Sequence, residues 1–272
     1  MDQAELRRCR SLLFLPASNP RAIEKARTLD ADMIVLDLED AVKDEDKAAA
    51  REAASAATHE GFGDRPVAIR MNPTGSVHYG EDVVAIRRSA ADFVILPKVE
   101  SAKQAVDAVW LVQKPVLAMI ETPRAVIDAA SIALAARGLV AGTNDLAAGL
   151  ALPPGSGRAG LVYALQRIVL AARAAGIPAF DGVYNSLADD AGLAAECAEG
   201  RAWGFDGKSV IHPSQIETAN RVFTPTAAEV EAARRLIEAS SGGAQRHEGR
   251  MVEQLHVDQA LAVIAKANRL PA

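Results

Sequence analysis

The sequence predicts an α/β protein, a (β/α)8 or TIM barrel followed by a C-terminal helical extension. Eight short apolar segments recur along the 272 residues, and Ala-rich stretches of helical period separate them. In addition, a polar side chain stands at or just past the end of each segment. Short apolar runs bounded by Gly, Pro or polar residues are typical of strands buried on both faces of a parallel sheet. Eight such strands alternating with helices match this barrel.

The predicted strands carry their polar residues towards one rim, because a parallel barrel gathers the carboxyl ends of its strands there. The segments, each with its trailing polar residues, are 11–18, 33–40, 67–72, 93–98, 116–122, 138–145, 177–182 and 204–213, the last being less regular than the others. We therefore expect nine polar side chains to converge on this rim. They are Glu39, Asp40, Arg70, Asn72, Lys98, Glu121, Asn144, Asp145 and Asp181.

Helix-start signals follow several of these strands. Ser18 or Asn19 can cap the first helix, and Pro20 suits its first position, where a missing N–H is harmless. Asp44 precedes the Ala-rich second helix and complements its positive end. Thr122, followed by proline, repeats the cap-then-proline pattern after the fifth strand.

The chain divides into a predicted catalytic barrel, residues 1–223, and a helical extension, residues 224–272. The extension contains two amphipathic helices, 226–239 and 251–268, separated by a Ser/Gly break. It either covers the bottom of the barrel or reaches a neighbouring subunit. Within the barrel, the Pro/Gly-rich segment 151–160 is either a mobile lid or an ordinary surface connection.

Composition narrows the functional class. The net charge is −5 and the basic residues are scattered, which argues against nucleic acid as a partner. No apolar run approaches the roughly 20 residues of a membrane helix, and the run after the N-terminal arginines is too short for a signal peptide. Cys9 and Cys197 show no ligand spacing and are expected to be inert, reduced thiols. We expect a soluble cytoplasmic protein that acts on small molecules and binds neither nucleic acid nor a membrane.

Two carboxylates at adjacent strand ends predict a metal site. Glu121 and Asp145 end the fifth and sixth strands, and neighbouring carboxylates without His or Cys suit a hard cation such as Mg²⁺. The alternative is that each acid pairs with a nearby Lys or Arg, or caps a helix.

Arg70 ends the third strand, where its rigid guanidinium could bind a substrate carboxylate through two hydrogen bonds. A structural ion pair with Glu39 or Asp40 is the alternative, and both roles can hold at once.

Two basic pairs at i,i+4 spacing lie near the starts of flanking helices: Arg21 with Lys25, and Lys47 with Arg51. Such pairs beside helix N-termini favour a phosphate-bearing ligand, although a solvated charged face is the ordinary interpretation of either pair alone.

Other patterns are less specific. Lys98 or Lys208 could serve a Schiff-base aldolase if desolvated, but neither has distinctive neighbours. The segment GFDGKS imitates the end of a P-loop, yet it lacks the first glycine and the following helix. The five histidines show no zinc-ligand spacing. Ile211 and His212, in IHPSQI, could place backbone groups near a bound substrate.

Seven sequence blocks together resemble a known family. In order they are RSLLFLPASNPR, IVLDLEDAV, AIRMN, LPKVES, MIETPRA, GTNDLAAGL and GFDGKSVIHPSQI, covering Arg10 to about Phe223. This series resembles the citrate lyase β-subunit and malyl-CoA lyase branch of the HpcH/HpaI aldolase superfamily.

The resemblance implies an Mg²⁺-dependent lyase that cleaves a carbon–carbon bond in a 3-hydroxyacyl-CoA such as citramalyl-, malyl- or citryl-thioester. The products are acetyl-CoA and a 2-oxo acid. By this likeness Glu121 and Asp145 bind the metal, and Arg70 binds the carboxyl or thioester region of the substrate. The basic residues, especially Lys25, face the phosphates of CoA. Asn144 is expected in the substrate site, and a homotrimer or a multiple of it is the expected assembly.

The resemblance leaves the general base open among three residues. Many relatives carry an aspartate in an MVD-type motif of the C-terminal extension, often acting in a neighbour's active site. This chain has Glu253 there, one methylene longer, with Asp258 and Asp40 as other candidates. Two further functions stay open at this point: a metal-dependent aldolase of free 2-oxo-hydroxy acids, and a non-catalytic acyl-CoA-binding component.

Overall fold

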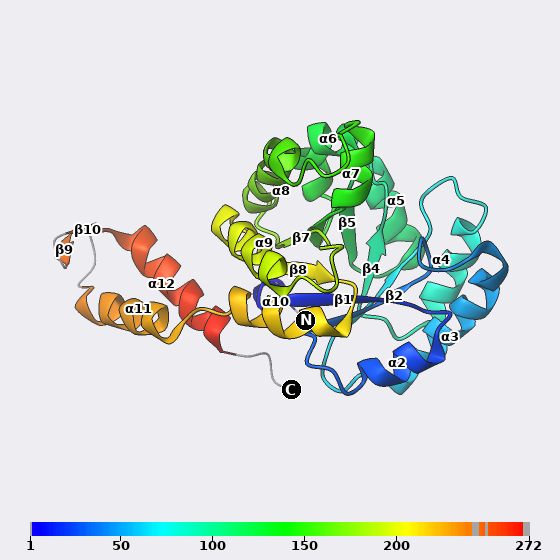
Figure 1. The fold of residues 1–272 in the computed structure, drawn as a ribbon, viewed down its shortest axis with the longest axis horizontal. Coiled ribbons are helices and arrows are strands. Elements are labelled where there is room, and N and C mark those ends of the chain that lie inside the picture. The colour runs from blue at the N-terminus through cyan, green and yellow to red at the C-terminus, as the bar shows by residue number, and fades with distance from the viewer. Residues whose placement is uncertain (1, 241–244, 248–249, 269–272) are drawn as a thin grey trace.

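The computed structural model describes residues 2–240, 245–247 and 250–268, and it contains a closed barrel of eight parallel strands (Figure 1). Each strand pairs with its neighbours in sequence, and β1 pairs with β8 to close the barrel. The predicted fold is therefore confirmed. The strands are β1 (Ser11–Pro16), β2 (Met33–Asp37), β3 (Val67–Arg70), β4 (Phe93–Leu96), β5 (Val116–Ile120), β6 (Gly138–Ala141), β7 (Ala179–Asp181) and β8 (Gly207–Val210).

Helices surround the barrel on its outside (Figure 1). They are α2 (Pro20–Ala26), α3 (Lys47–Glu60), α4 (Tyr79–Arg88), α5 (Ala102–Val112), α6 (Pro123–Ala133), α7 (Thr143–Gly149), α8 (Val162–Ala174), α9 (Asp190–Trp203) and α10 (Ile216–Phe223). Three short 3-10 turns add η1 (Asp44–Asp46), η2 (Ala159–Leu161) and η3 (Pro213–Gln215). The short α1 (Gln3–Leu6) precedes β1, and Leu6 belongs to the core inside the barrel.

The helix starts follow the predicted capping residues in most cases. Asn19, rather than Ser18, accepts a hydrogen bond from the backbone of the first turn of α2, with Pro20 at its first position. Thr122 caps α6 in the same way. Asp44 instead begins η1, and α3 starts at Lys47 without a side-chain cap.

Alternation along the strands decides which side chains enter the barrel. Phe14, Met119 and Phe180 belong to the core inside it, whereas their sequence neighbours Leu13 and Ala118 pack in the outer core under the helices. Side chains two positions after an inward residue point inward again, because successive strand residues face opposite sides. This period of two controls which polar strand ends reach the mouth.

Beyond the barrel, the extension forms a helical hairpin, and Figure 1 shows it projecting from the side where β1 begins. It comprises α11 (Ala227–Ala239), β9 (Gln245–His247), β10 (Arg250–Val252) and α12 (Gln254–Ala267). At the end of α12, Lys266 Nζ donates hydrogen bonds to the backbone oxygens of Arg7, Cys9 and Asp206, at the bottom of the barrel. The predicted boundary at residue 223 coincides with the end of α10, and its status as a domain boundary stays a prediction.

Both cysteines are buried free thiols, as expected. Burial raises the pKa of each thiol to about 12, which keeps it protonated and unreactive near neutral pH. In the described part of the chain, every helix is too short or too polar to cross a membrane.

Candidate active site

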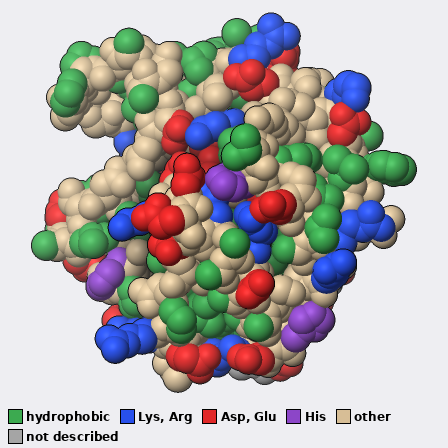
Figure 2. Space-filling view, turned by 90° about the vertical axis from the view of Figure 1, so that its right-hand side faces the viewer, with side chains coloured by type: hydrophobic (Ala, Val, Ile, Leu, Met, Phe, Trp, Pro, Cys, Tyr) green, Lys and Arg blue, Asp and Glu red, His purple; other side chains and the backbone are tan. Residues whose placement is uncertain are grey.

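Six of the predicted site residues line one cavity of about 390 Å³ at the mouth of the barrel. They are Asp40, Arg70, Glu121, Asn144, Asp145 and Ile211. Figure 2, which looks at the side of the molecule on the right of Figure 1, shows acidic and basic side chains next to one another on this face. The predicted convergence of polar side chains at the carboxyl ends of the strands is therefore present for five of them, and Ile211 is a predicted substrate contact.

Arg70 is fixed by carboxylates on one side of the cavity. Its Nε and Nη2 atoms each lie 2.6 Å from an oxygen of Asp37, and its Nη1 lies 3.0 Å from Glu39 and 3.7 Å from Asp40. Burial opposes the charge, but these hydrogen bonds and charges raise the pKa of Arg70 overall. The predicted ion pair with Glu39 and Asp40 is present, and the guanidinium still lines the cavity over the ring of Phe14.

Asp37 is the stronger partner of Arg70, and the sequence analysis missed it. The residue ends β2 directly opposite Arg70 in the register of β2 and β3. Val35, two positions earlier, lies inside the barrel, so the period of two could have identified Asp37 as inward-facing.

Glu121 is buried deep in the cavity wall, with 2% of its surface exposed. One carboxylate oxygen accepts a 2.7 Å hydrogen bond from the backbone N–H of Lys98. The side chain lies directly against Gly142, where any Cβ atom would overlap it. Burial raises the pKa of Glu121 to about 8, and the negative charges of Glu39 and Asp145 add to this effect.

Asp145 lies in the first turn of α7, with 41% of its side chain exposed. The ammonium group of Lys98 lies 3.8 Å from this carboxylate and 3.2 Å from Glu39. Lys98 thus contacts acids that flank the cavity on two sides.

The charges around the mouth do not balance. Within the part of the chain that the structure describes, five carboxylates at the mouth face two cationic groups, Arg70 and Lys98, so full ionisation leaves three uncompensated negative charges. The acids are Asp37, Glu39, Asp40, Glu121 and Asp145. Burial is the main cause of the raised pKa of Glu121, and the neighbouring charges of Glu39 and Asp145 raise it further. A divalent cation would offset the surplus of negative charge, so the donor set fits a hard metal ion.

The protein supplies few ligands for such an ion. Among the described residues, no group of three or more His, Cys, Asp or Glu side chains is arranged around a metal position. Glu121 and Asp145 are the pair that could hold it, and water or substrate oxygens would complete the coordination. That division is typical of Mg²⁺, which keeps several waters, rather than of Zn²⁺.

Two other predicted contacts lie at or near the mouth. Asn144 exchanges side-chain hydrogen bonds with Asn185, which also lines the cavity. Ile211 is 40% exposed beside them. His212 does not line the cavity, because its ring accepts a hydrogen bond from the backbone of Ser214 and caps η3.

Asp181 does not join the rim, which corrects the expectation. It directly follows the inward-facing Phe180 and therefore points to the opposite side, under α9. There Arg158 and Lys208 bind it at 2.8 and 3.2 Å. Lys208, fully buried, also contacts Glu196 at 2.7 Å.

Neither lysine suits a Schiff-base mechanism, which requires a lowered pKa. Lys208 is surrounded by acids outside the barrel. For Lys98, burial acts to lower the pKa, but the charge of Glu39 raises it overall.

The two basic pairs differ in what they can contact. Arg21 and Lys25 are exposed on α2, and no hydrogen bond or ion pair of their side chains occurs within the described residues. Lys47 is buried and donates to the backbone oxygens of Leu38 and Glu39. Arg51 is buried and paired with acids at the start of α4. The expectation that Lys47 and Arg51 present free charge to a phosphate does not fit this arrangement.

Of the predicted bases, Asp40 alone lines the cavity of its own chain, 59% exposed. Glu253 precedes α12 on the projecting hairpin, and Asp258 is exposed on α12. Figure 1 places this hairpin on the side of the barrel away from the carboxyl ends of β1 and β8.

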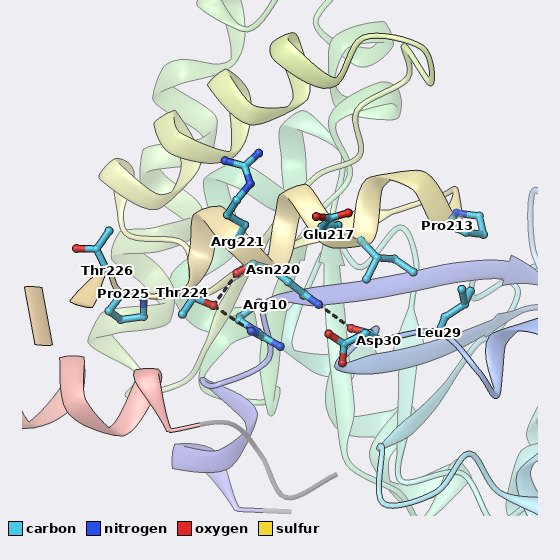
Figure 3. A pocket seen from close by; sticks show the side chains of 11 residues that line it. Arg10, Leu29, Asp30, Pro213, Glu217, Asn220, Arg221, Thr224, Pro225 and Thr226 are labelled. Carbon is cyan, nitrogen blue, oxygen red and sulfur yellow. Dashed lines mark hydrogen bonds between the residues drawn. The ribbon is translucent and has the colours of Figure 1, made fainter. Parts of the chain in front are cut away.

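A larger cavity of about 760 Å³ lies away from the mouth, beside α10 and the segment after α2. Figure 3 shows hydrogen bonds that link Arg10, Thr224, Asn220 and Asp30 in its wall. Arg10 donates to Thr224 and pairs with Asp32, and Asn220 donates to the backbone oxygen of Asp30. Because these groups satisfy each other, the smaller cavity at the mouth is the better candidate site.

Comparisons with known proteins agree with this assignment. The family model of the HpcH/HpaI aldolase/citrate lyase family matches residues 10–213, and that of a C-C bond lyase of the TIM-barrel fold matches residues 158–269. The (3S)-malyl-CoA thioesterase of Cereibacter sphaeroides is 42% identical over 97% of this chain and 96% of its own length.

Two further relatives carry other names. Citrate lyase subunit beta of Haemophilus influenzae is 34% identical over 95% of this chain and 96% of its own. The crystal structure of CitE from Mycobacterium tuberculosis in complex with magnesium, acetoacetate and coenzyme A has a TM-score of 0.83 at 34% identity. It covers 96% of this chain and 99% of that one. The resemblance inferred from the motifs is confirmed, and the chain belongs to the HpcH/HpaI aldolase/citrate lyase family.

Proposed function

We propose that the protein is an Mg²⁺-dependent lyase that cleaves a malyl-type 3-hydroxyacyl-CoA into acetyl-CoA and a 2-oxo acid. The observation that carries this proposal is the acid-rich cavity where Glu121 and Asp145 lie near Arg70. A cavity of about 390 Å³ accommodates the acid end of such a thioester, whereas the CoA moiety must extend over the rim. The complex of CitE with magnesium, acetoacetate and coenzyme A supports the same ligand classes.

The residues fit the bond changes of this cleavage. A base takes the proton of the substrate hydroxyl, the C–O bond becomes a carbonyl, and the neighbouring C–C bond breaks. The electron pair then forms the enolate of the acetyl thioester, which is protonated to give acetyl-CoA. Arg70 would stabilise negative charge that develops on oxygen. Mg²⁺, when bound between Glu121 and Asp145, would supply Lewis-acid polarisation.

The general base would come either from the same chain or from a second copy of it. Asp40 lies at the cavity of its own chain, within 3.7 Å of Arg70. Glu253 would have to come from a second copy of the chain, since its own hairpin projects from the other side of the barrel. A homotrimer or a multiple of it would permit such an exchange, and this assembly remains part of the proposal.

CoA would be held by the exposed pair Arg21 and Lys25. Both residues lie on α2, which follows β1 at the mouth, and their charges are not engaged within the described residues. Phosphate oxygens accept charge-assisted hydrogen bonds from Arg and Lys side chains.

Thioester hydrolysis is a second candidate, favoured by the 42% identity to a (3S)-malyl-CoA thioesterase. Here water would attack the thioester carbonyl and release CoA and the free hydroxy acid. The two reactions share the substrate and differ in the bond that breaks, so their products separate them.

The test is incubation with Mg²⁺ and citramalyl-, malyl- and citryl-CoA, with acetyl-CoA, 2-oxo acid and free thiol measured together. Lyase activity gives acetyl-CoA and 2-oxo acid in equal amounts without free CoA. Free CoA with no 2-oxo acid would assign hydrolysis instead. If no thioester is consumed, the proposal fails and a non-catalytic acyl-CoA-binding role gains support.

Variants of the exposed pair separate the remaining alternative. Arg21→Ala and Lys25→Ala together should raise KM for the CoA ester, whereas Lys103→Ala, an exposed lysine on α5, should not. An aldolase of free 2-oxo-hydroxy acids would turn over those acids equally well in all three proteins.

A further inference from the structure

Lys98, directly after β4, has an uncommon backbone conformation. Its φ angle is 51°, in the left-handed region that non-glycine residues seldom occupy. This conformation aims its N–H at Glu121, which accepts the hydrogen bond at 2.7 Å. Strained residues of this kind concentrate at functional sites. The backbone of Lys98 therefore orients one of the two expected metal ligands.

The side chain of the same residue contacts the other expected ligand. Its ammonium lies 3.8 Å from Asp145 and 3.2 Å from Glu39. Both carboxylate oxygens of Glu39 are buried, and each is paired with a cation: one lies 3.2 Å from Lys98 Nζ and the other 3.0 Å from Arg70 Nη1. The Lys98 ammonium thus lies among the mouth carboxylates, which are more numerous than the cationic groups there.

We propose that Lys98 is a positioning residue whose ammonium acts as a built-in counter-cation for the metal site. In the metal-free protein it offsets the repulsion between the carboxylates around the mouth. When a divalent ion binds, the ammonium gives up its contact with Asp145, which then turns to the ion. The inference rests on the proposed function, because it assumes that Glu121 and Asp145 bind Mg²⁺.

The proposal makes opposite predictions for the two states of the protein. Without the lysine charge, the metal-free site keeps its carboxylates but loses a cation, so the folded protein becomes less stable. Removing the lysine charge also removes the repulsion between the ammonium and the metal ion. For two positive charges several ångströms apart near a protein surface, we expect the loss of this repulsion to strengthen Mg²⁺ binding by roughly tenfold.

Lys98→Met is the direct test, because it removes the charge and keeps both side-chain length and the backbone N–H. Mg²⁺ affinity is measured by calorimetric titration, and Tm is measured in EDTA and in saturating Mg²⁺. We expect Kd for Mg²⁺ to fall about tenfold, Tm in EDTA to drop, and the Tm difference from wild type to disappear in Mg²⁺. Lys98→Arg should restore the wild-type values.

Two more variants keep the test decisive. Lys98→Gly relaxes the left-handed backbone and retains the N–H, so it reports the effect of charge even if Lys98→Met folds poorly. Lys103→Met removes an exposed lysine that is paired with Asp107 on α5. It should change neither Mg²⁺ affinity nor the response of Tm to Mg²⁺.

An unchanged or weaker Mg²⁺ affinity in both Lys98→Met and Lys98→Gly overturns the counter-cation role. A loss of Tm that persists in saturating Mg²⁺ also overturns it, since the lysine would then be merely structural. If wild type and Glu121→Gln bind Mg²⁺ equally weakly, the metal assignment itself fails, and the proposed function fails with it. Loss of Mg²⁺ binding in Glu121→Gln, with no change in Lys98→Met, defeats the Lys98 proposal alone.

Discussion

Two groups of charged side chains are built into the same barrel on opposite faces of its strands. The outer cluster lies under α9 and consists of Arg158, Asp181, Glu196, Glu199 and Lys208. The mouth cluster consists of Asp37, Glu39, Asp40, Arg70, Lys98, Glu121 and Asp145. The outer cluster has three acids and two bases, whereas the mouth cluster has five acids and two bases.

The difference separates structural charge from functional charge. In the outer cluster each acid meets a base at 3.7 Å or less, so the group is complete without a ligand. In the mouth cluster the pKa of Glu121 rises to about 8 and that of Glu39 to about 6, in each case chiefly through burial. Strongly perturbed pKa values cluster at functional sites, so these shifts favour the mouth cluster as the site of a ligand of opposite charge.

The largest expected effect comes from removing one acid of the mouth cluster. Glu121→Gln should lower kcat/KM for the CoA ester by about 10²- to 10³-fold, because the expected metal site loses one of its two carboxylates and with it the electrostatic stabilisation that the ion would supply. Its stability to urea in EDTA should not fall, since the raised pKa of Glu121 shows that the charged form is disfavoured there. If this variant loses much stability but keeps normal turnover, Glu121 has a structural role, and the mouth cluster is not the functional one.

Breaking the outer cluster should have the opposite result. Lys208→Met leaves Asp181 buried with one base fewer, and breaking a buried pair costs about 3–5 kcal/mol of unfolding free energy. Urea denaturation measures this loss, and the double variant with Asp181→Asn should recover part of it. Mg²⁺ affinity should be unchanged once the protein is folded, and a specific loss of metal binding would show that the clusters are coupled.

The pH dependence of stability sharpens the comparison. Because the folded pKa of Glu39 is about 6 against 4.5 for a free carboxyl, the native state holds this proton more tightly than the unfolded chain. The resulting stabilisation is complete below pH 4.5 and is lost as pH rises through 6, an effect of about 2 kcal/mol. Glu39→Gln should lack this decline when urea unfolding is followed in EDTA. If the unfolding free energy of wild type and of Glu39→Gln changes with pH in the same way, the raised pKa of Glu39 is contradicted.

The smallest effect concerns two buried hydroxyls on adjacent strands. Ser11 donates a 2.7 Å hydrogen bond to Asn220 outside the barrel, whereas Ser209 Oγ is buried beside the cavity with no partner within the described residues. Ser11→Ala should cost about 1 kcal/mol, and Ser209→Ala should be neutral or stabilising. Thermal unfolding of both variants provides the measurement, and equal losses would indicate that Ser209 has a partner in solution.

The sequence was sufficient for the barrel because each strand is an apolar run bounded by turn residues. It also located the mouth residues, since Arg70 and Glu121 stand two positions after inward-facing strand residues. The same pattern could not place Asp181, because β7 is apolar on both faces and the residue is one position off the inward set. Spacing alone put Lys47 and Arg51 on one helix face, but did not say that this face is buried.

Lys266 has a practical consequence for anyone who shortens this protein. Burial lowers the pKa of its amine to about 8, yet the side chain fastens the last helix to three main-chain oxygens beneath the strands. A protein truncated after residue 223 would lack this donor, so the three carbonyl groups would lose a hydrogen bond and the bottom of the barrel around Cys9 would become exposed. We therefore expect such a truncated barrel to aggregate.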